Sequence, residues 1–471
     1  MARSSVVILV ADGIRPDTLA AAMTAGEVPA LAQLSADGGM HVVSSVFPSV
    51  TGPAYTPFIM GRYPGPVGLP GIRWYDRAAS ATARLPRARS YVGSEFRKID
   101  RDLDPLAPTL FELSDSNLAA LSVIGRGLKP RDREGHTIAF GLRAARVHFS
   151  GNVRGWLAID RDIGALIARR IRGERPRVAF CALTGIDKTS HAEGHDAPVV
   201  RDALRTVDET AAQIRADAER DGRWDAMHLW IVSDHGHSPV RFHEDLAGLI
   251  QSWKLGVIAH PWIYGPGRDV AVMVSGNAMA HLYLELGSRS PTRAPWSAHE
   301  KKWAWLPERL LERESVDLVL LPLEGNSCEV RGRGRGTAHV TMQNGRYTYR
   351  PVTGDPLALG AHESLSHDDA YDATMASDYP DAIVQIAHLA GSARVGEIML
   401  SASRNWDYRA KWEPIPHVSS HGALHREHMQ VPLLLNRPAS GVPRRTADVM
   451  PSALSALGVA VPAGLDGRSF L

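Results

Sequence analysis

The chain has 471 residues, 44% of them hydrophobic, which is enough for one large α/β body with insertions or for two or three domains. Its 53 basic and 51 acidic residues are interleaved and leave a formal net charge of +2, so there is no electrostatic basis for binding a nucleic-acid polymer or an anionic membrane patch. A phosphate-bearing substrate would therefore have to be held locally.

The chain contains two cysteines, Cys181 and Cys328, which are too few for a disulfide framework. The apolar run RVAFCAL around Cys181 favours a buried, inert thiol. The N-terminal stretch VVILVADG is too short for a signal sequence with a cleavage site or for a membrane span. These features predict a cytoplasmic protein without a membrane segment, and they leave the oligomeric state open.

In chain order, the first predicted element is a strand at residues 6–10, whose continuous β-branched run is typical of a strand buried on both faces of a parallel sheet. Helix-like spacing then begins at Pro16 and again at Pro29, and residues 41–46 read as a strand. This alternation predicts a mostly parallel sheet with helices on both faces. It continues with predicted strands at 121–124, 178–183, 229–232 and 431–435 and predicted helices at 199–218 and 449–457.

The pattern changes between Asp234 and His421. Strand-like segments at 280–286 and 316–320 flank a helix-like segment at 298–314, and two short strand candidates surround the run RGRGRG. The turn signal Asn344-Gly345 beside that run favours a solvated hairpin over a nucleic-acid contact. We therefore predict an inserted α+β subdomain at 265–355 within a discontinuous core formed by 1–240 and 395–471.

Seven side chains with ligand or nucleophile chemistry lie at points where a predicted strand has ended. The carboxyl ends of strands are where α/β enzymes assemble their sites. Aspartate and histidine together are typical ligands of divalent cations such as zinc or manganese, and one hydroxyl added to them suffices for two-metal phosphoryl or sulfuryl transfer. The seven are Asp12, Thr51, Asp187, His191, Asp234, His235 and His421.

Taken singly, these residues have simpler explanations. Thr51 has the sequence context of a helix N-cap, Asp12 that of a strand-end cap, and Asp234 that of a turn closed by Gly236. Asp187 and His191 are four residues apart and would project to the same side of a helical turn. The joint pattern favours metal binding, with Thr51 as a nucleophile that forms a covalent intermediate.

Six segments resemble, in order, the motifs of the alkaline phosphatase superfamily. They are most similar to its nucleotide pyrophosphatase/phosphodiesterase branch, also called type I phosphodiesterases. The C-terminal RTADVMPSALSALGVAVPAGLDGRSFL is also similar to the end of that branch, while residues 241–393 match weakly. The six segments are VVILVADGIRPD, the Thr-x-Pro element followed by GRYP, LPGIRWYD, GIDKTSHAEGH, IVSDHGHSP and SSHGALHREHMQVPLLL.

This resemblance implies an alkaline-phosphatase-like three-layer α/β/α sandwich that hydrolyses a small-molecule phosphate ester with two divalent metal ions, usually zinc, with manganese as the alternative. It implies that Thr51 is both nucleophile and metal ligand. It assigns Asp187, His191 and His421 to one ion, and Asp12, Thr51, Asp234 and His235 to the other.

One departure concerns Ala54, because many diesterases of this branch have asparagine after the Thr-x-Pro. The absence of that amide leaves phosphomonoester or phosphonate hydrolysis as an alternative to phosphodiester or pyrophosphate cleavage. Sulfate ester hydrolysis is less favoured. Sulfatases of this superfamily typically use a formylglycine formed within a Cys/Ser-x-Pro-x-Arg element, and this chain has TGPAY instead. The alternative from another class is a catalytically silent protein that binds metal and a phosphorylated ligand.

Several neighbouring residues are weaker candidates. Trp74 and Tyr75 follow the nucleophile segment as in the family and are predicted substrate contacts, as are Lys188 and Arg15. Packing is favoured for the other tryptophans of the insert, Trp296, Trp303 and Trp305. Surface or ligand-supporting positions are favoured for His195, His237, His425 and His428.

Overall fold

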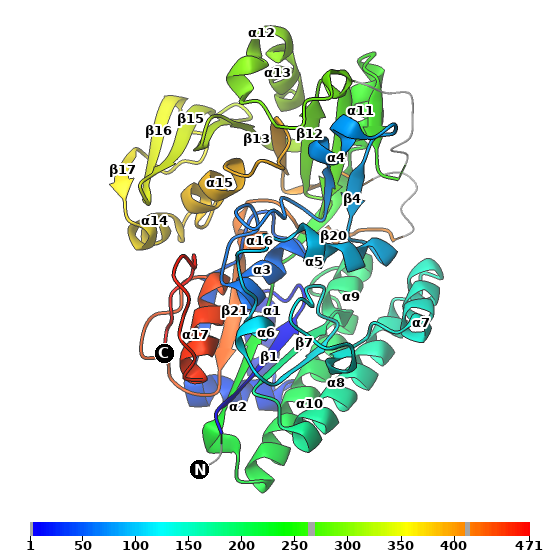
Figure 1. Ribbon diagram of the computed structural model, residues 1–471, viewed down its shortest axis with the longest axis vertical. Helices are drawn as coiled ribbons and strands as arrows, with labels where there is room; N and C mark the ends of the chain where they lie inside the picture. Colours follow the sequence, from blue (N-terminus) through cyan, green and yellow to red (C-terminus); the bar gives the residue numbers. More distant parts are fainter. Residues whose placement is uncertain (1–2, 262–268, 410–414) are drawn as a thin grey trace.

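The structure is a computed structural model that describes residues 3–261, 269–409 and 415–471 (Figure 1). Its central sheet is seven-stranded in the described part of the chain, and β1 pairs in parallel with β7 on one side and β8 on the other. Six of the seven β1 residues are buried, which explains the continuous apolar run in the sequence. In spatial order the strands are β2 (Met40–Ser44), β21 (Gln430–Leu435), β8 (Met227–Val232), β1 (Ser5–Ala11), β7 (Val178–Leu183), β5 (Asn117–Ala120) and β6 (Arg133–Glu134).

Successive side chains of β1 enter two different hydrophobic cores. Val6 and Ile8 point into one, and Val7 and Leu9 into the other, as the period of a strand requires. Helices cover both faces, so the predicted three-layer α/β/α sandwich with a mostly parallel sheet is confirmed. The first core is closed by α3 (Thr56–Met60), α6 (Leu110–Leu113) and α17 (Val449–Ala456), and the second by α1 (Pro16–Thr24), α2 (Pro29–Gly38), α8 (Arg154–Glu174) and α10 (Pro198–Arg220).

Two predicted elements differ from the structure. The strand predicted at 121–124 is wrong, because β5 ends at Ala120 and Leu121 adopts a φ of 54°, which a strand cannot continue. The helix predicted at 298–314 is divided into α12 (Glu300–Trp303) and α13 (Trp305–Leu311). Pro307 has no N–H to donate to the preceding turn, which explains the break before it.

A second sheet, seen in the upper half of Figure 1, has nine strands among the described residues and is antiparallel except for its β10–β11 pair. Its β15–β16 turn consists of Asn344 and Gly345 with φ values of 51° and 70°, which confirms the predicted hairpin. In spatial order the strands are β10 (Val257–Ala259), β11 (Val270–Ser275), β12 (Met279–Leu284), β18 (Ile398–Ala402), β13 (Val316–Pro322), β14 (Asn326–Gly332), β15 (Gly336–Gln343), β16 (Arg346–Gly354) and β17 (His362–Leu365).

Helix α15 (Ala382–Ala390) packs on one face of this sheet, and α11 (Leu246–Ser252) and α13 pack on the other. The predicted subdomain, 265–355, supplies β11 to β16, and its first four residues lie outside the described residues. Its separation from the core as a folding unit stays a prediction. No helix in the described ranges combines the length and the apolar character that crossing a bilayer requires.

A buried ion pair connects the C-terminal segment to the residue that precedes α15. Arg445 donates through Nε and Nη2 to the two carboxylate oxygens of Asp381, both at 2.8 Å, and the two side chains are 2% and 0% exposed. We expect Arg445→Met to lower the free energy of unfolding by about 3–5 kcal/mol, because it leaves the buried carboxylate of Asp381 without a cation and with the amide of Gln385 as its remaining side-chain donor.

The measurement is chemical denaturation of Arg445→Met, with Arg350→Met as the control. Arg350 pairs with Glu363 at 2.8 Å, but these side chains are 65% and 58% exposed, so that variant should change stability by about 1 kcal/mol or less. Equal losses in the two variants would contradict a special contribution from the buried pair.

Candidate functional site

Elements far apart in the sequence bring the seven predicted residues to one edge of the central sheet. Six of the seven are buried, and Thr51 is partly exposed. Thr51 precedes a 3-10 turn whose N-cap is Gly52, so it is not a helix cap. Asp12 follows β1, Asp234 and His235 follow β8, Asp187 and His191 lie in α9 (Gly185–Glu193) after β7, Thr51 lies between β2 and α3, and His421 follows β20 (Ser419–Ser420).

Three histidines surround one carboxylate oxygen. Oδ1 of Asp187 lies 3.2 Å from Nε2 of His191, 3.5 Å from Nε2 of His421 and 3.0 Å from Nε2 of His237. The Asp187–His191 contact confirms the expected i,i+4 arrangement on one side of a helix. These four residues form a group with the donor set and spacing of a metal site.

The remaining residues surround the hydroxyl of Thr51. Its Oγ1 lies 3.2 Å from Oδ2 of Asp234, 3.3 Å from Nε2 of His235 and 3.5 Å from Oδ1 of Asp12. Nε2 of His235 is 3.3 Å from the same oxygen of Asp12. The hydroxyl and the second group of ligand-capable atoms therefore share one small volume.

The two groups are contiguous through a pair of stacked rings. His235 and His421 lie 3.6 Å apart between ring centroids with an interplanar angle of 8°. Two imidazolium cations would repel each other at that separation, so at least one of the two rings is neutral. Burial and the neighbouring cation of His235 both hold the pKa of His421 well below its usual value, so His421 is the neutral ring.

Hydrogen bonds to backbone carbonyls fix the tautomers of the three predicted histidine ligands. Nδ1 lies 2.8 Å from the carbonyl oxygen of Ser419 in His191, 2.9 Å from that of Ser49 in His421, and 3.2 Å from that of Gly236 in His235. A carbonyl only accepts, so Nδ1 carries the proton and a neutral ring directs the Nε2 lone pair into the cluster. This tautomer is the one that a metal ion requires.

The cluster concentrates negative charge in a dry environment. Burial and the carboxylate of Asp12 raise the pKa of Asp234 to about 7. Burial lowers the pKa of His235, but the carboxylates of Asp234 and Asp12 outweigh that effect and raise it to about 9. Three carboxylates packed this closely need positive charge beside them, which divalent cations supply.

Two supporting residues could not be assigned from local sequence alone. Asp160, buried in α8, accepts hydrogen bonds from the backbone N–H groups of Thr184 and Gly185 at 3.1 and 2.5 Å, and so fixes the start of the helix that carries Asp187. The only signal for Asp160 is a carboxylate on the apolar face of an amphipathic helix. Gly13, with a φ of 82°, has no room for a Cβ, which would lie 2.9 Å from the ring of His237.

Of the predicted substrate contacts, the two aromatic residues lie in the hydrophobic core, and Lys188 lies in the site. Trp74 and Tyr75 are buried, at 2% and 5% exposure, and belong to the hydrophobic core, so they are packing residues rather than an exposed stacking surface. Lys188 lies in the site, with Nζ 2.6 Å from Oδ2 of Asp187. Arg15 donates to Asp17 through Nε and Nη2 and to the carbonyl of His237 through Nη1 at 3.1 Å, so three of its five N–H donors bind protein groups.

The four histidines predicted to support the ligands have different partners in the structure. His237 contacts Asp187, whereas His428 accepts from the backbone N–H of Ala423 and pairs with Ser238, and His425 pairs with Glu427. His195 lies 3.4 Å from Arg15. Their positions depend on long-range packing, which local sequence does not reveal.

Of the remaining side chains named from the sequence, all but Trp305 pack in hydrophobic clusters. Ala54 is 1% exposed and packs in the core beside the second sheet, so its small size fits that packing. Trp296 and Trp303 are buried in the other core of that sheet, and Trp305 is 38% exposed.

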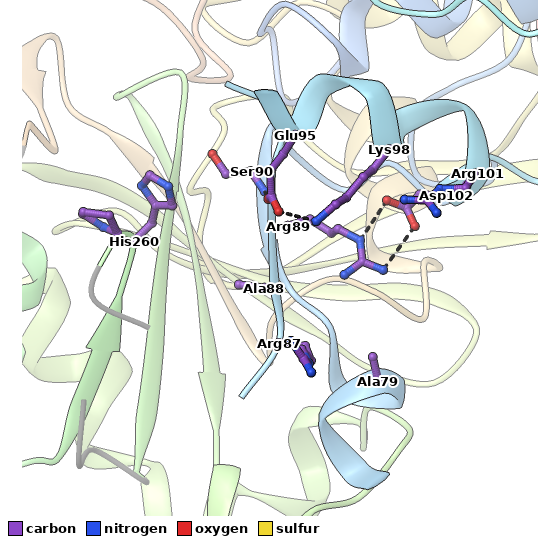
Figure 2. A pocket seen from close by; sticks show the side chains of 11 residues that line it. Ala79, Arg87, Ala88, Arg89, Ser90, Glu95, Lys98, Arg101, Asp102 and His260 are labelled. Atoms are coloured by element: carbon purple, nitrogen blue, oxygen red, sulfur yellow. Dashed lines mark hydrogen bonds and ion pairs between the residues drawn. The ribbon is translucent and has the colours of Figure 1, made fainter. Parts of the chain in front are cut away.

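A separate pocket of about 660 Å³ lies beside β4 (Ala88–Ser90), and none of the seven residues lines it (Figure 2). Figure 2 shows that two of its cations have acidic partners within the pocket, since Arg89 contacts Asp102 and Lys98 contacts Glu95. This pocket is distinct from the cluster around Thr51.

Comparisons with known proteins agree with the geometry. An uncharacterized pyrophosphatase/phosphodiesterase of Schizosaccharomyces pombe is 22% identical over 314 residues, which cover 64% of this chain but only 59% of that relative's length. Two solved structures share the fold. Phosphonoacetate hydrolase from Sinorhizobium meliloti 1021 in complex with phosphonoacetate has a TM-score of 0.58 and 16% identity, covering 97% of this chain and 96% of its own.

The second is an inactive threonine-to-alanine variant of murine ectonucleotide pyrophosphatase/phosphodiesterase 5 in complex with AMP. Its TM-score is 0.57 and its identity 15%, covering 98% of this chain and 96% of its own. The sequence pattern of the family described as type I phosphodiesterase / nucleotide pyrophosphatase matches residues 6–424. The chain therefore belongs to the type I phosphodiesterase/nucleotide pyrophosphatase family, within the alkaline phosphatase superfamily.

Proposed function

We propose that this protein is a hydrolase that cleaves phosphodiester or pyrophosphate bonds with two divalent metal ions, zinc or manganese, and with Thr51 as the nucleophile. The observation that carries this proposal is the convergence of Thr51 Oγ1, buried carboxylates and imidazole Nε2 atoms in one small volume. Imidazoles that bond outward through Nδ1 and direct Nε2 into a cluster of buried carboxylates fit metal ligation.

One ion would be held by Asp187, His191 and His421, and the other by Asp12, Thr51, Asp234 and His235. When bound, the two cations supply Lewis acidity that stabilises the attacking and leaving oxygens of an in-line displacement. Two ligand-capable groups support this proposal in part. One group contains Asp187, His191 and His421 together with His237, and the other contains Asp12 and His235 together with Asp187. The stacked rings of His235 and His421 join the two groups.

The chain's own residues position the nucleophile. Oδ2 of Asp234 and Nε2 of His235, at 3.2 and 3.3 Å, fix the Thr51 hydroxyl at the partly exposed side of the cluster. Attack by Oγ1 on phosphorus forms a covalent phosphoryl-threonine as the bond to the leaving group breaks, and the hydroxyl proton of Thr51 leaves with that group. Water then releases the phosphoryl group from Thr51, as a phosphate monoester when the substrate is a diester. The inactive structural neighbour, a threonine-to-alanine variant, supports this assignment.

A specific observation favours a second candidate, phosphomonoester or phosphonate hydrolysis. That chemistry needs a basic side chain for the additional negative charge of the phosphoryl group, and the ammonium of Lys188 contacts the cluster through Asp187. The structural neighbour that is a phosphonoacetate hydrolase is consistent with this alternative.

The test is hydrolysis of bis(4-nitrophenyl) phosphate by protein reconstituted with zinc or manganese. We expect turnover that is abolished by exhaustive chelation and restored when the metal is added back, because the ions participate in the reaction. Turnover that persists after chelation would refute the two-metal mechanism. Metal and phosphate binding without turnover of this diester, of 4-nitrophenyl phosphate or of ATP would instead indicate the catalytically silent protein.

We also propose a cytoplasmic location, supported by two cysteines that are both free and buried. Fractionation of the native source tests it, and recovery of the protein outside the cytoplasm would exclude it.

A further inference from the structure

Lys188 places a positive charge directly beside the carboxylates of the site. Its Nζ donates to Oδ2 of Asp187 at 2.6 Å, whereas Oδ1 of the same carboxylate faces the three histidine rings. The carboxylate is therefore shared between a lysine on one side and the ligand-capable nitrogens on the other. Helix α9 fixes this arrangement, because Asp187 and Lys188 are consecutive in its first turns.

The ammonium of Lys188 has donors left for a bound substrate. An ammonium has three N–H donors, and Asp187 accepts one of them. The Lys188 side chain is 29% exposed, while that of Asp187 is 2% exposed, so Lys188 lies at the solvent side of the cluster. Arg15, the other predicted anion contact, uses its guanidinium on Asp17 and on the carbonyl of His237. Lys188 is thus the better-placed cation of the two.

Formal charges define what kind of substrate this arrangement suits. Asp12, Asp187 and Asp234 carry three negative charges, and the two divalent cations of the proposed function carry four positive ones. The resulting single positive charge matches a phosphodiester, which carries one negative charge. Lys188 adds a second positive charge, which a diester leaves uncompensated.

We propose that Lys188 selects substrates that carry a second negative charge on or next to the reacting phosphorus. Such substrates are phosphate monoesters and phosphonates, in which the charge lies on the phosphoryl group, and pyrophosphates, in which it lies in the leaving group. Singly charged diesters are cleaved with a lower kcat/KM than these substrates. This inference rests on the proposed function and names the substrate class of the same site.

The test compares two substrates on one preparation of zinc-reconstituted, full-length protein. The ratio of kcat/KM for 4-nitrophenyl phosphate to that for bis(4-nitrophenyl) phosphate is measured in the unmodified protein and in Lys188→Gln. We expect the substitution to lower this ratio about tenfold, because the lost charge interacts more strongly with the doubly charged ester. Loss of metal or of folded protein affects both substrates equally and cancels in the ratio.

Two matched variants serve as controls. Lys188→Arg keeps the charge and should retain most of the ratio, although its planar group fits a single contact less well. Lys302→Gln removes the same charge from an exposed pair with Glu285 and should leave the ratio unchanged. ATP distinguishes the two sources of charge. If Lys188→Gln lowers kcat/KM for ATP as much as for the monoester, Lys188 contacts the leaving group. If it lowers kcat/KM for the monoester alone, Lys188 contacts the phosphoryl group.

A binding readout separates this inference from the proposed reaction. At pH 8 inorganic phosphate is doubly charged, and it should raise the Tm of the unmodified zinc-loaded protein more than that of Lys188→Gln. Dimethyl phosphate, with one charge, should give the same small shift in both. An unchanged ester ratio together with an unchanged phosphate shift in Lys188→Gln would overturn the inference while leaving the proposed function intact. If no ester is hydrolysed, the proposed function fails, and the phosphate shift still decides the selectivity of Lys188.

Discussion

Thr51→Ala is expected to lower kcat by at least about a thousandfold, because it removes the hydroxyl that contacts both carboxylates and the imidazole of one ligand group. Thr51 Oγ1 lies within 3.2–3.5 Å of Asp234, His235 and Asp12. Steady-state hydrolysis of an aryl phosphate ester by zinc-reconstituted protein gives the rate. An acid quench during turnover should trap a phosphorylated peptide containing Thr51 in the unmodified protein and none in the variant.

Thr51→Ser is the matched control, since it keeps the hydroxyl and removes only the methyl group. We expect it to turn over substrate measurably and to form the phosphorylated peptide. Both variants should unfold close to the temperature of the unmodified protein, because Thr51 makes no cap hydrogen bond and is partly exposed. An alanine variant within about tenfold of the original kcat would exclude Thr51 as the nucleophile.

Asp187→Ala is expected to reduce the zinc content of the reconstituted protein from about two ions per chain to about one, and to abolish turnover. The carboxylate of Asp187 is the centre on which His191, His237 and His421 converge. Without it, only imidazole nitrogens remain in that group. The reduced zinc content should appear in elemental analysis after gel filtration.

The same substitution should weaken the stabilisation of the folded chain by zinc. At a free zinc concentration of about 100 times Kd, one bound ion contributes about 2.7 kcal/mol, which thermal unfolding with and without zinc detects. Asp102→Ala is the control, since Asp102 is 9% exposed and pairs with Arg89 in the separate pocket of Figure 2, which none of the seven site residues lines. It should lower stability yet retain both ions. Retention of two ions by Asp187→Ala would contradict the ligand assignment.

The fold follows from the sequence because its main signals are local. The apolar run of β1 and the amphipathic period of α10 (Pro198–Arg220) specify a buried strand and a covering helix without knowledge of the rest of the chain. The local signals fail where a single dihedral or a missing N–H decides the outcome, as at Leu121 and at Pro307.

The sequence also determined which side chains carry the chemistry. Parallel strands end at the same edge of a sheet, so residues that follow β1, β7 and β8 must meet there even though more than 200 residues separate Asp12 from Asp234. Aspartate beside histidine at those positions is sufficient to predict divalent cations, before any distance is known.

Only the tertiary structure decided how each of these groups is used. The hydrogen-bond partner of each ring nitrogen decides which nitrogen of a histidine carries the proton. The carbonyls of Ser49 and Ser419, which orient His421 and His191, come from segments far away in the sequence. The burial of Trp74 and the contact of His237 with Asp187 depend in the same way on packing across the sheet edge. Composition and local period determine which elements form, whereas the electrostatic environment of a side chain is set by neighbours that the chain brings near only on folding.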